Sequence, residues 1–168
     1  MKHLILVALL GYSFSIAAQE PLSYDEMLFH VKEIDLTDSL QFDTSPEEVS
    51  AIDSFTVKKW FHQVLPAAAG NKFKNRTFSL VGKITSHNNF DLLMLLEQKR
   101  KNDGSGTQII YLISVKKNGD FIASLRAAAG GATKKTGYNI TSCLYKDYKI
   151  FQDSRITIIN KAINDMAY

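Results

Sequence analysis

The sequence contains little cysteine and little proline: one cysteine and three prolines in 168 residues. A single cysteine, Cys143, excludes an intrachain disulfide, so packing has to stabilise the fold even in an oxidising compartment. Cys143 lies in YNITSCLYK, a strand-like run without the local signature of a thiol enzyme. We therefore interpret it as a small packed side chain rather than a nucleophile.

Long apolar runs are also missing. A membrane-spanning helix needs about 20 apolar residues, so the sequence predicts no transmembrane segment. The short apolar run at residues 4–10 follows Lys2 and precedes small residues up to Gln19, the order found in signal peptides. This order predicts a signal peptide over residues 1–19, cleaved after Ala18 or Gln19, and an exported chain, periplasmic or secreted. A buried N-terminal strand is the alternative interpretation.

Motifs for metals, nucleotides and catalysis are missing as well. The histidines beyond residue 19 are far apart and form no ligand pattern: His30, His62 and His87. Residues 102–106 lack the acids of a calcium loop, and residues 130–133 lack the Lys-Ser/Thr of a phosphate-binding loop. Asp91 and Glu97 share one face of a predicted strand, but about 20 Å apart at about 3.3 Å per residue, too far for paired catalytic carboxylates. The sequence therefore predicts no catalytic residue, no metal and no cofactor.

Charge is divided unevenly along the chain. Residues 20–53 hold ten acids and one lysine, whereas residues 54–168 hold 18 lysines and arginines and seven acids. The first part therefore carries −9 and the second +11. Opposite charges and several apolar side chains predict that the acidic segment docks on the basic part, in a contact that salt weakens. A solvated acidic tail is the alternative.

The predicted elements form one domain over residues 20–168. An acidic segment covers residues 20–45, and Ser45, Pro46 and Glu48 resemble the start of a helix over residues 46–65, whose apolar face includes Trp60 and Phe61. A β-meander follows over residues 77–159, centred on a hairpin whose turn contains Asn118 and Gly119. Strands are predicted over 77–86, 90–98, 108–116, 121–128, 138–145 and 148–159, with residues 130–131 in a loop. The fold class is α+β and mostly β: an antiparallel, curled meander sheet of six or seven strands with one main helix packed against it.

One family resemblance rests on turn and core patterns. Gly82-Lys83-Ile84, Asn89-Phe90-x-x-Leu93 and YLISVKKNGDFIASL occur in this order. Across residues 82–158 the chain resembles small exported β-rich proteins of uncharacterised function from Gram-negative bacteria, especially gut commensals. The resemblance implies an extracytoplasmic compartment and a β-rich fold. It transfers no catalytic residue.

Five cations are predicted to meet at one end of the sheet. Alternate turns of a meander lie at the same end, so the loop after the second predicted strand would adjoin the loop after the fourth; their cations are Lys99, Arg100, Lys101, Lys134 and Lys135. Such a surface suits an anionic glycan, a lipid headgroup or an acidic protein surface. A solvated rim is the alternative, and nucleic acid is not expected because the chain is predicted to be exported and shows no exposed aromatic series.

These features predict an exported, noncatalytic binding or interaction module. The alternative is a small extracytoplasmic hydrolase or redox enzyme whose site the sequence does not reveal. A cleft with converging polar groups would favour the enzyme, whereas a filled core with a basic rim would favour the binding module.

Overall fold

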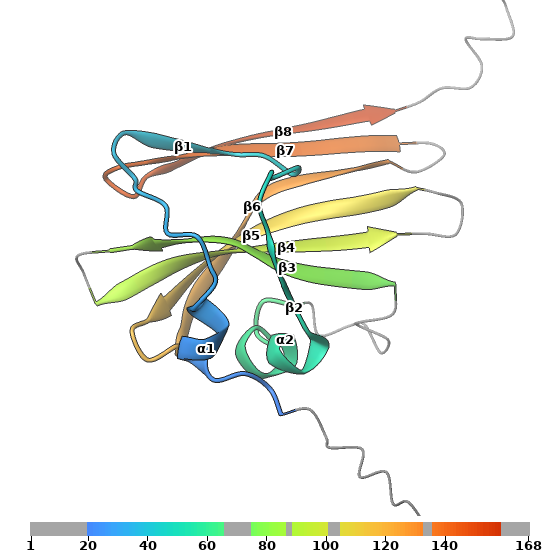
Figure 1. The fold of residues 1–168 in the computed structure, drawn as a ribbon. Helices are drawn as coiled ribbons and strands as arrows, with labels where there is room; N and C mark the ends of the chain where they lie inside the picture. Colours follow the sequence, from blue (N-terminus) through green and yellow to red (C-terminus); the bar gives the residue numbers. More distant parts are fainter. Residues whose placement is uncertain (1–19, 66–74, 87–88, 101–104, 133–135, 159–168) are drawn as a thin grey trace, which may run out of the picture.

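An antiparallel sheet of eight strands organises the chain in the computed structural model, which describes residues 20–65, 75–86, 89–100, 105–132 and 136–158 (Figure 1). Along the sheet the strand order is β1-β7-β6-β5-β4-β3-β2, and β8 pairs with the other edge of β7. The strands are β1 (Ser39–Phe42), β2 (Ser50–Ile52), β3 (Arg76–Thr85), β4 (Phe90–Arg100), β5 (Gly106–Lys116), β6 (Phe121–Ala132), β7 (Thr136–Tyr145) and β8 (Ile150–Ile158). The fold is thus mostly β and built around an antiparallel meander.

The meander predicted over residues 77–159 is confirmed, since β3 to β8 pair in sequence order. Two short strands, β1 and β2, come from the segment before the meander and bring the sheet to eight strands, close to the six or seven predicted. The predicted loop at residues 130–131 is wrong. Gly130 and Gly131 lie inside β6 and pair with β5 on one side and β7 on the other.

The central hairpin joins β5 to β6 through residues 117–120. Gly119 has a φ of +89°, and its amide donates to the Lys116 carbonyl at 2.9 Å. Only glycine adopts this conformation without steric cost. A Cβ atom there would also lie 2.8 Å from the Tyr24 ring, so the turn packs against the N-terminal segment.

Both faces of the central strands are buried. Along β4, Leu93 and Leu95 face one hydrophobic cluster with the two helices, whereas Leu92, Met94 and Leu96 face a second cluster that includes residues of β1 and β7. This alternation places two cores on one sheet. Figure 1 shows the helices below the central strands, and β1, β7 and β8 above them.

Bulges let one sheet enclose the second core. In β3 the register shifts between Leu80 and Gly82, so Leu80 faces the first cluster and Ile84 the second. The β5–β6 ladder shifts twice, and small side chains at Ala127 and Ala128 line the second cluster. Because bulges bend and twist strands, the curvature is concentrated in β3 and β6.

The helix prediction over residues 46–65 is wrong in its bounds. The main helix is α2 (Ser54–Trp60), and a second, α1 (Tyr24–Leu28), precedes it. Asp53, not Ser45, caps α2: its Oδ1 accepts from the amides of Phe55 at 2.7 Å and Thr56 at 2.9 Å. Residues 50–52 instead pair with the free edge of β3. This pairing gives hydrogen-bond partners to backbone amides and carbonyls of β3, which would lack them if residues 50–52 were helical. No helix among the described residues is long and apolar enough to cross a membrane.

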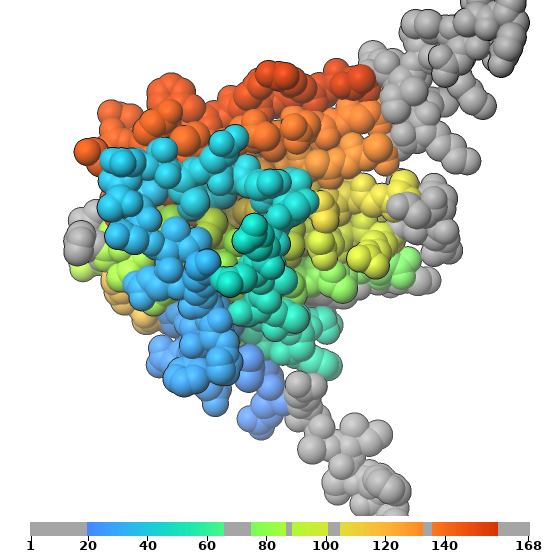
Figure 2. All heavy atoms as spheres, turned by 45° about the horizontal axis from the view of Figure 1, so that its top comes forward, coloured from blue at the N-terminus to red at the C-terminus, as the bar shows by residue number. Residues whose placement is uncertain are grey.

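The acidic segment lies across the sheet, so the predicted docking is found, but through contacts other than charge (Figure 2). Ile34 donates its amide to the Lys83 carbonyl at 2.8 Å, and Lys83 donates to the Lys32 carbonyl at 2.8 Å. Further along, β1 pairs with β7, and Phe42 is buried in the second cluster. Lys32 pairs with Glu48, which belongs to the acidic stretch of residues 20–53 and not to the basic part of the chain. Backbone hydrogen bonds and apolar packing therefore hold the segment in place.

These contacts change the expected effect of salt. Raising NaCl from about 0.1 M to about 1 M shortens the Debye length from about 10 Å to about 3 Å, but it leaves hydrogen-bonded and apolar contacts in place. Cleavage by a Glu-specific protease after Glu33 should therefore not accelerate. Dividing the cleavage rate by that of a free peptide spanning residues 28–40 removes the effect of salt on the protease itself. A normalised rate that rises steeply with salt would show that charge holds the segment.

Candidate functional site

The two loops of the predicted basic surface leave the sheet at the same end. Lys99 pairs with Thr107 of β5, and Thr107 pairs in turn with Gly131 of β6. The β4–β5 and β6–β7 connections therefore start side by side. Lys99 is half-buried and Arg100 exposed at this end, whereas Lys101, Lys134 and Lys135 lie outside the described residues.

A hollow of about 480 Å³ opens at this basic end. The described residues that line it include no carboxylate and several hydrogen-bond donors: Gln98, Lys99, Arg100, Gly106, Thr107, Gln108, Gly130 and Gly131. Gly131 keeps the backbone close, because a Cβ atom there would lie 2.9 Å from Thr107 Cγ2 and 3.1 Å from the Gly106 carbonyl oxygen. Cationic, amide and hydroxyl donors around a concave surface suit an anionic or polyhydroxylated ligand.

A buried ion pair stands next to this end. The Arg76 Nη1 donates to Glu97 Oε1 at 2.6 Å, and the Tyr111 hydroxyl donates to Glu97 Oε2 at 3.0 Å. Burial, and then the Glu97 carboxylate, raise the pKa of Tyr111, which keeps the hydroxyl as a donor. Since both carboxylate oxygens are engaged, Glu97 is held by these partners rather than presented to the hollow.

The other strand carboxylate, Asp91, is neutralised separately. Lys117 donates to Asp91 Oδ1 at 2.5 Å, and Asp91 is 5% exposed. Asp91 and Glu97 are thus each paired with a separate cation, Lys117 for Asp91 and Arg76 for Glu97. Burial, followed by the negative charge of Asp91, raises the pKa of Tyr24 to about 12. Asp91 and Lys117 therefore form a structural ion pair, whereas the buried Tyr24 hydroxyl has no hydrogen-bond partner among the described residues.

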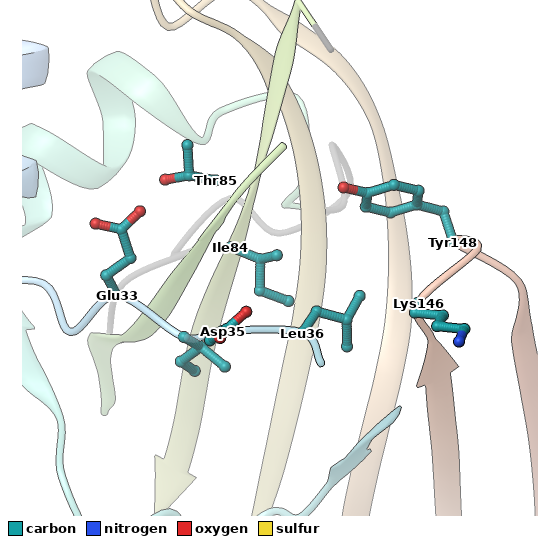
Figure 3. A pocket seen from close by; sticks show the side chains of 8 residues that line it. Glu33, Asp35, Leu36, Ile84, Thr85, Lys146 and Tyr148 are labelled. Atoms are coloured by element: carbon teal, nitrogen blue, oxygen red, sulfur yellow. The ribbon is translucent and has the colours of Figure 1, made fainter. Parts of the chain in front are cut away.

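A second hollow, of about 650 Å³, lies where the acidic segment passes the β7–β8 turn. Its lining mixes carboxylates, an amine, hydroxyls and apolar side chains: Glu33, Ile34, Asp35, Leu36, Ile84, Thr85, Lys146 and Tyr148. Figure 3 shows the Tyr148 ring extending from the turn toward β3, with its hydroxyl leading. This lining could accept a small polar molecule, and no sequence pattern signalled it because it joins three distant segments.

Tyr148 has a backbone conformation that is unusual for its residue type. Its φ is +62°, in the left-handed region that turns normally fill with glycine or asparagine. The amide donates to the Tyr145 carbonyl at 2.8 Å, and the ring packs against Phe90 with centroids 5.6 Å apart. The ring contact offsets the cost of the turn and fixes one wall of the second hollow.

The remaining candidates from the sequence lie apart from one another. Cys143 is half-buried on β7, opposite Gln41 of β1 and Phe151 of β8, rather than in a core. His30 and His62 are exposed, and His87 lies outside the described residues. Within the described ranges, no group of three or more potential ligands could hold a metal ion.

Comparison with known proteins adds no relative: no family model, no curated protein and no solved structure matches the chain. The hollow at the basic end and the charges around it are therefore the features of the described residues that bear most directly on function.

Proposed function

We propose that the protein is an exported, noncatalytic binding module that takes an anionic glycan at its basic end. The observation that carries this proposal is the hollow beside Lys99 and Arg100, whose described lining offers donors and no carboxylate. The nearby Glu97 is paired with Arg76 and Tyr111, so its charge opposes an incoming anion only weakly. The sheet is filled with apolar side chains on both faces, so a ligand would bind in a surface hollow rather than inside the sheet.

The lining favours a glycan over the other anionic partners considered. Gln98, Gln108 and Thr107 add neutral amides and a hydroxyl to the cations, and such groups hydrogen-bond sugar hydroxyls as well as acidic groups. A lipid headgroup site would gain from apolar side chains that enter the membrane, and the described lining of this hollow holds only short or polar side chains. An acidic protein would need a wider and flatter contact.

Neutralising the two described cations should weaken binding to an acidic glycan. We expect the variant Lys99→Gln/Arg100→Gln to elute from a heparin or polyuronate matrix at a lower salt concentration than the parent. Each ionic contact between a cation and the matrix contributes about 0.2–1 kcal/mol. Adding Lys101→Gln, Lys134→Gln and Lys135→Gln should abolish retention at low salt with stability almost unchanged. The matched control is Lys116→Gln/Lys149→Gln, which removes two charges at the opposite end of the sheet.

The choice of matrix separates the possible partners. Competition by a soluble uronic-acid oligosaccharide, but not by neutral dextran, supports the glycan. Stronger retention on vesicles with anionic lipid would identify a lipid headgroup as the partner instead of the glycan. Stronger retention on polyglutamate would identify an acidic protein. Equal elution of the basic-end variant, its control and the parent would overturn the proposed site.

A further inference from the structure

The strand β8 forms an open edge of the sheet and is exposed on both of its faces. Residues 151–157 are all exposed, and the apolar side chains Phe151 and Ile156 retain 66% and 77% of their accessible surface. Within the described part of the chain, only β7 pairs with β8. Figure 1 shows β8 at the upper margin of the molecule, beyond β7. Its outer backbone edge therefore offers a place for another strand to pair.

This edge lacks most of the features that usually block strand addition. The β7–β8 ladder runs through nine consecutive residue pairs without a register shift, from Thr136 with Ile158 to Leu144 with Ile150. The strand contains no proline and no lysine. Gln152 fixes its position, since Nε2 donates to the Arg126 carbonyl at 2.7 Å and to Ser142 Oγ at 3.0 Å. A long, regular edge of this kind is a template for another strand.

The sequence of β8 is complementary to itself in the antiparallel direction. If two copies pair with Ser154 opposite Ser154, Asp153 of each faces Arg155 of the other, so two ion pairs form across the junction. In the same register Phe151 faces Thr157, and Gln152 faces Ile156. Within one copy Arg155 Nε already lies 3.0 Å from Asp153 Oδ2, which shows that the two side chains share a face.

We propose that the protein forms a two-fold symmetric homodimer in which β8 pairs with β8 of a second copy, with Ser154 on the axis. The partner is a second copy because, when this strand pairs antiparallel with itself, each Asp153 faces an Arg155. Pairing joins the two sheets into one continuous sheet and removes the exposed edge of both copies. It also shields part of the apolar surface of Phe151 and Ile156 without disturbing either core, since among the described side chains of β8 only Ile150 packs against a cluster.

Charge reversal tests the register. Asp153→Arg places like charges opposite each other twice, as does Arg155→Asp, and each should raise the dimer dissociation constant about tenfold or more. Combining the two changes restores opposite charges at both positions and should restore the dimer. Both side chains are largely exposed, so unfolding curves of the dilute monomers should stay close to the parent. Sedimentation equilibrium over a range of protein concentrations measures the dissociation constant.

A cross-link gives a second, independent readout. In a Cys143→Ser background, Ser154→Cys brings the new thiols face to face at the two-fold axis, where mild oxidation should link the copies. Thr157→Cys is the control, because its two thiols would lie about 20 Å apart at about 3.3 Å per residue. The proposal is overturned if the parent stays monomeric at high protein concentration, if the charge reversals leave the dissociation constant unchanged, or if both cysteine variants cross-link equally.

Discussion

Replacing Phe61 by alanine is expected to lower the free energy of unfolding by about 3–5 kcal/mol, the range for truncating a fully buried aromatic side chain. Phe61 is 1% exposed and belongs to the cluster between the helices and the sheet. Phe61 is also the C-cap residue of α2, and its amide donates to the Val57 carbonyl at 2.9 Å. Truncation would leave a cavity that the paired strands cannot close, because their positions are fixed by hydrogen bonds to both neighbours.

The neighbouring Trp60 is the matched control. The sequence predicts that Trp60 shares the apolar face of the helix with Phe61, but the structure places the Trp60 side chain half-buried at the margin of the cluster. Its indole nitrogen donates to the Leu22 carbonyl at 2.9 Å, and its ring lies 5.5 Å from that of Tyr24. Trp60→Ala should therefore cost clearly less than Phe61→Ala in equilibrium denaturation. The reverse order would mean that the helix packs through Trp60.

The strands of the meander could be predicted because their local signals agree with the tertiary structure. Runs rich in β-branched and aromatic residues are separated by turn residues such as Asn118 and Gly119, and six predicted strands match β3 to β8 closely. Gly130 and Gly131 misled the prediction because glycine is common in loops. At Gly131 the missing side chain permits close approach of β6 to Thr107 and Tyr138 on the neighbouring strands, a requirement that only the three-dimensional pairing reveals.

The segment before the meander was harder to predict because tertiary contacts decide its structure. Residues 45–48 carry a convincing helix-start pattern, yet the chain passes them without a helix and pairs residues 50–52 with β3. The open edge of a strand outweighs a weak local preference. For the same reason the second hollow could not be foreseen. The adjacency of the strand ends at Lys99 and Gly131 could be, since the order of strands in a meander fixes which connections adjoin.

The ion pair between Arg76 and Glu97 should give the second large effect. Arg76→Met is expected to destabilise the fold by about 3–5 kcal/mol, because it leaves a buried carboxylate without its cation. The Glu97 side chain is 4% exposed, and among its described partners the hydroxyl of Tyr111 would remain. Urea denaturation at neutral pH measures the loss.

A double-mutant cycle separates the pair from the packing of its side chains. Glu97→Gln alone should cost less than Arg76→Met, since Arg76 is 16% exposed and its charge can still reach water. The double variant Arg76→Met/Glu97→Gln should then be more stable than the sum of the two losses predicts, because it leaves no buried charge unpaired. Strict additivity would show that the two side chains act independently, and that the short contact between them contributes nothing to the stability of the sheet.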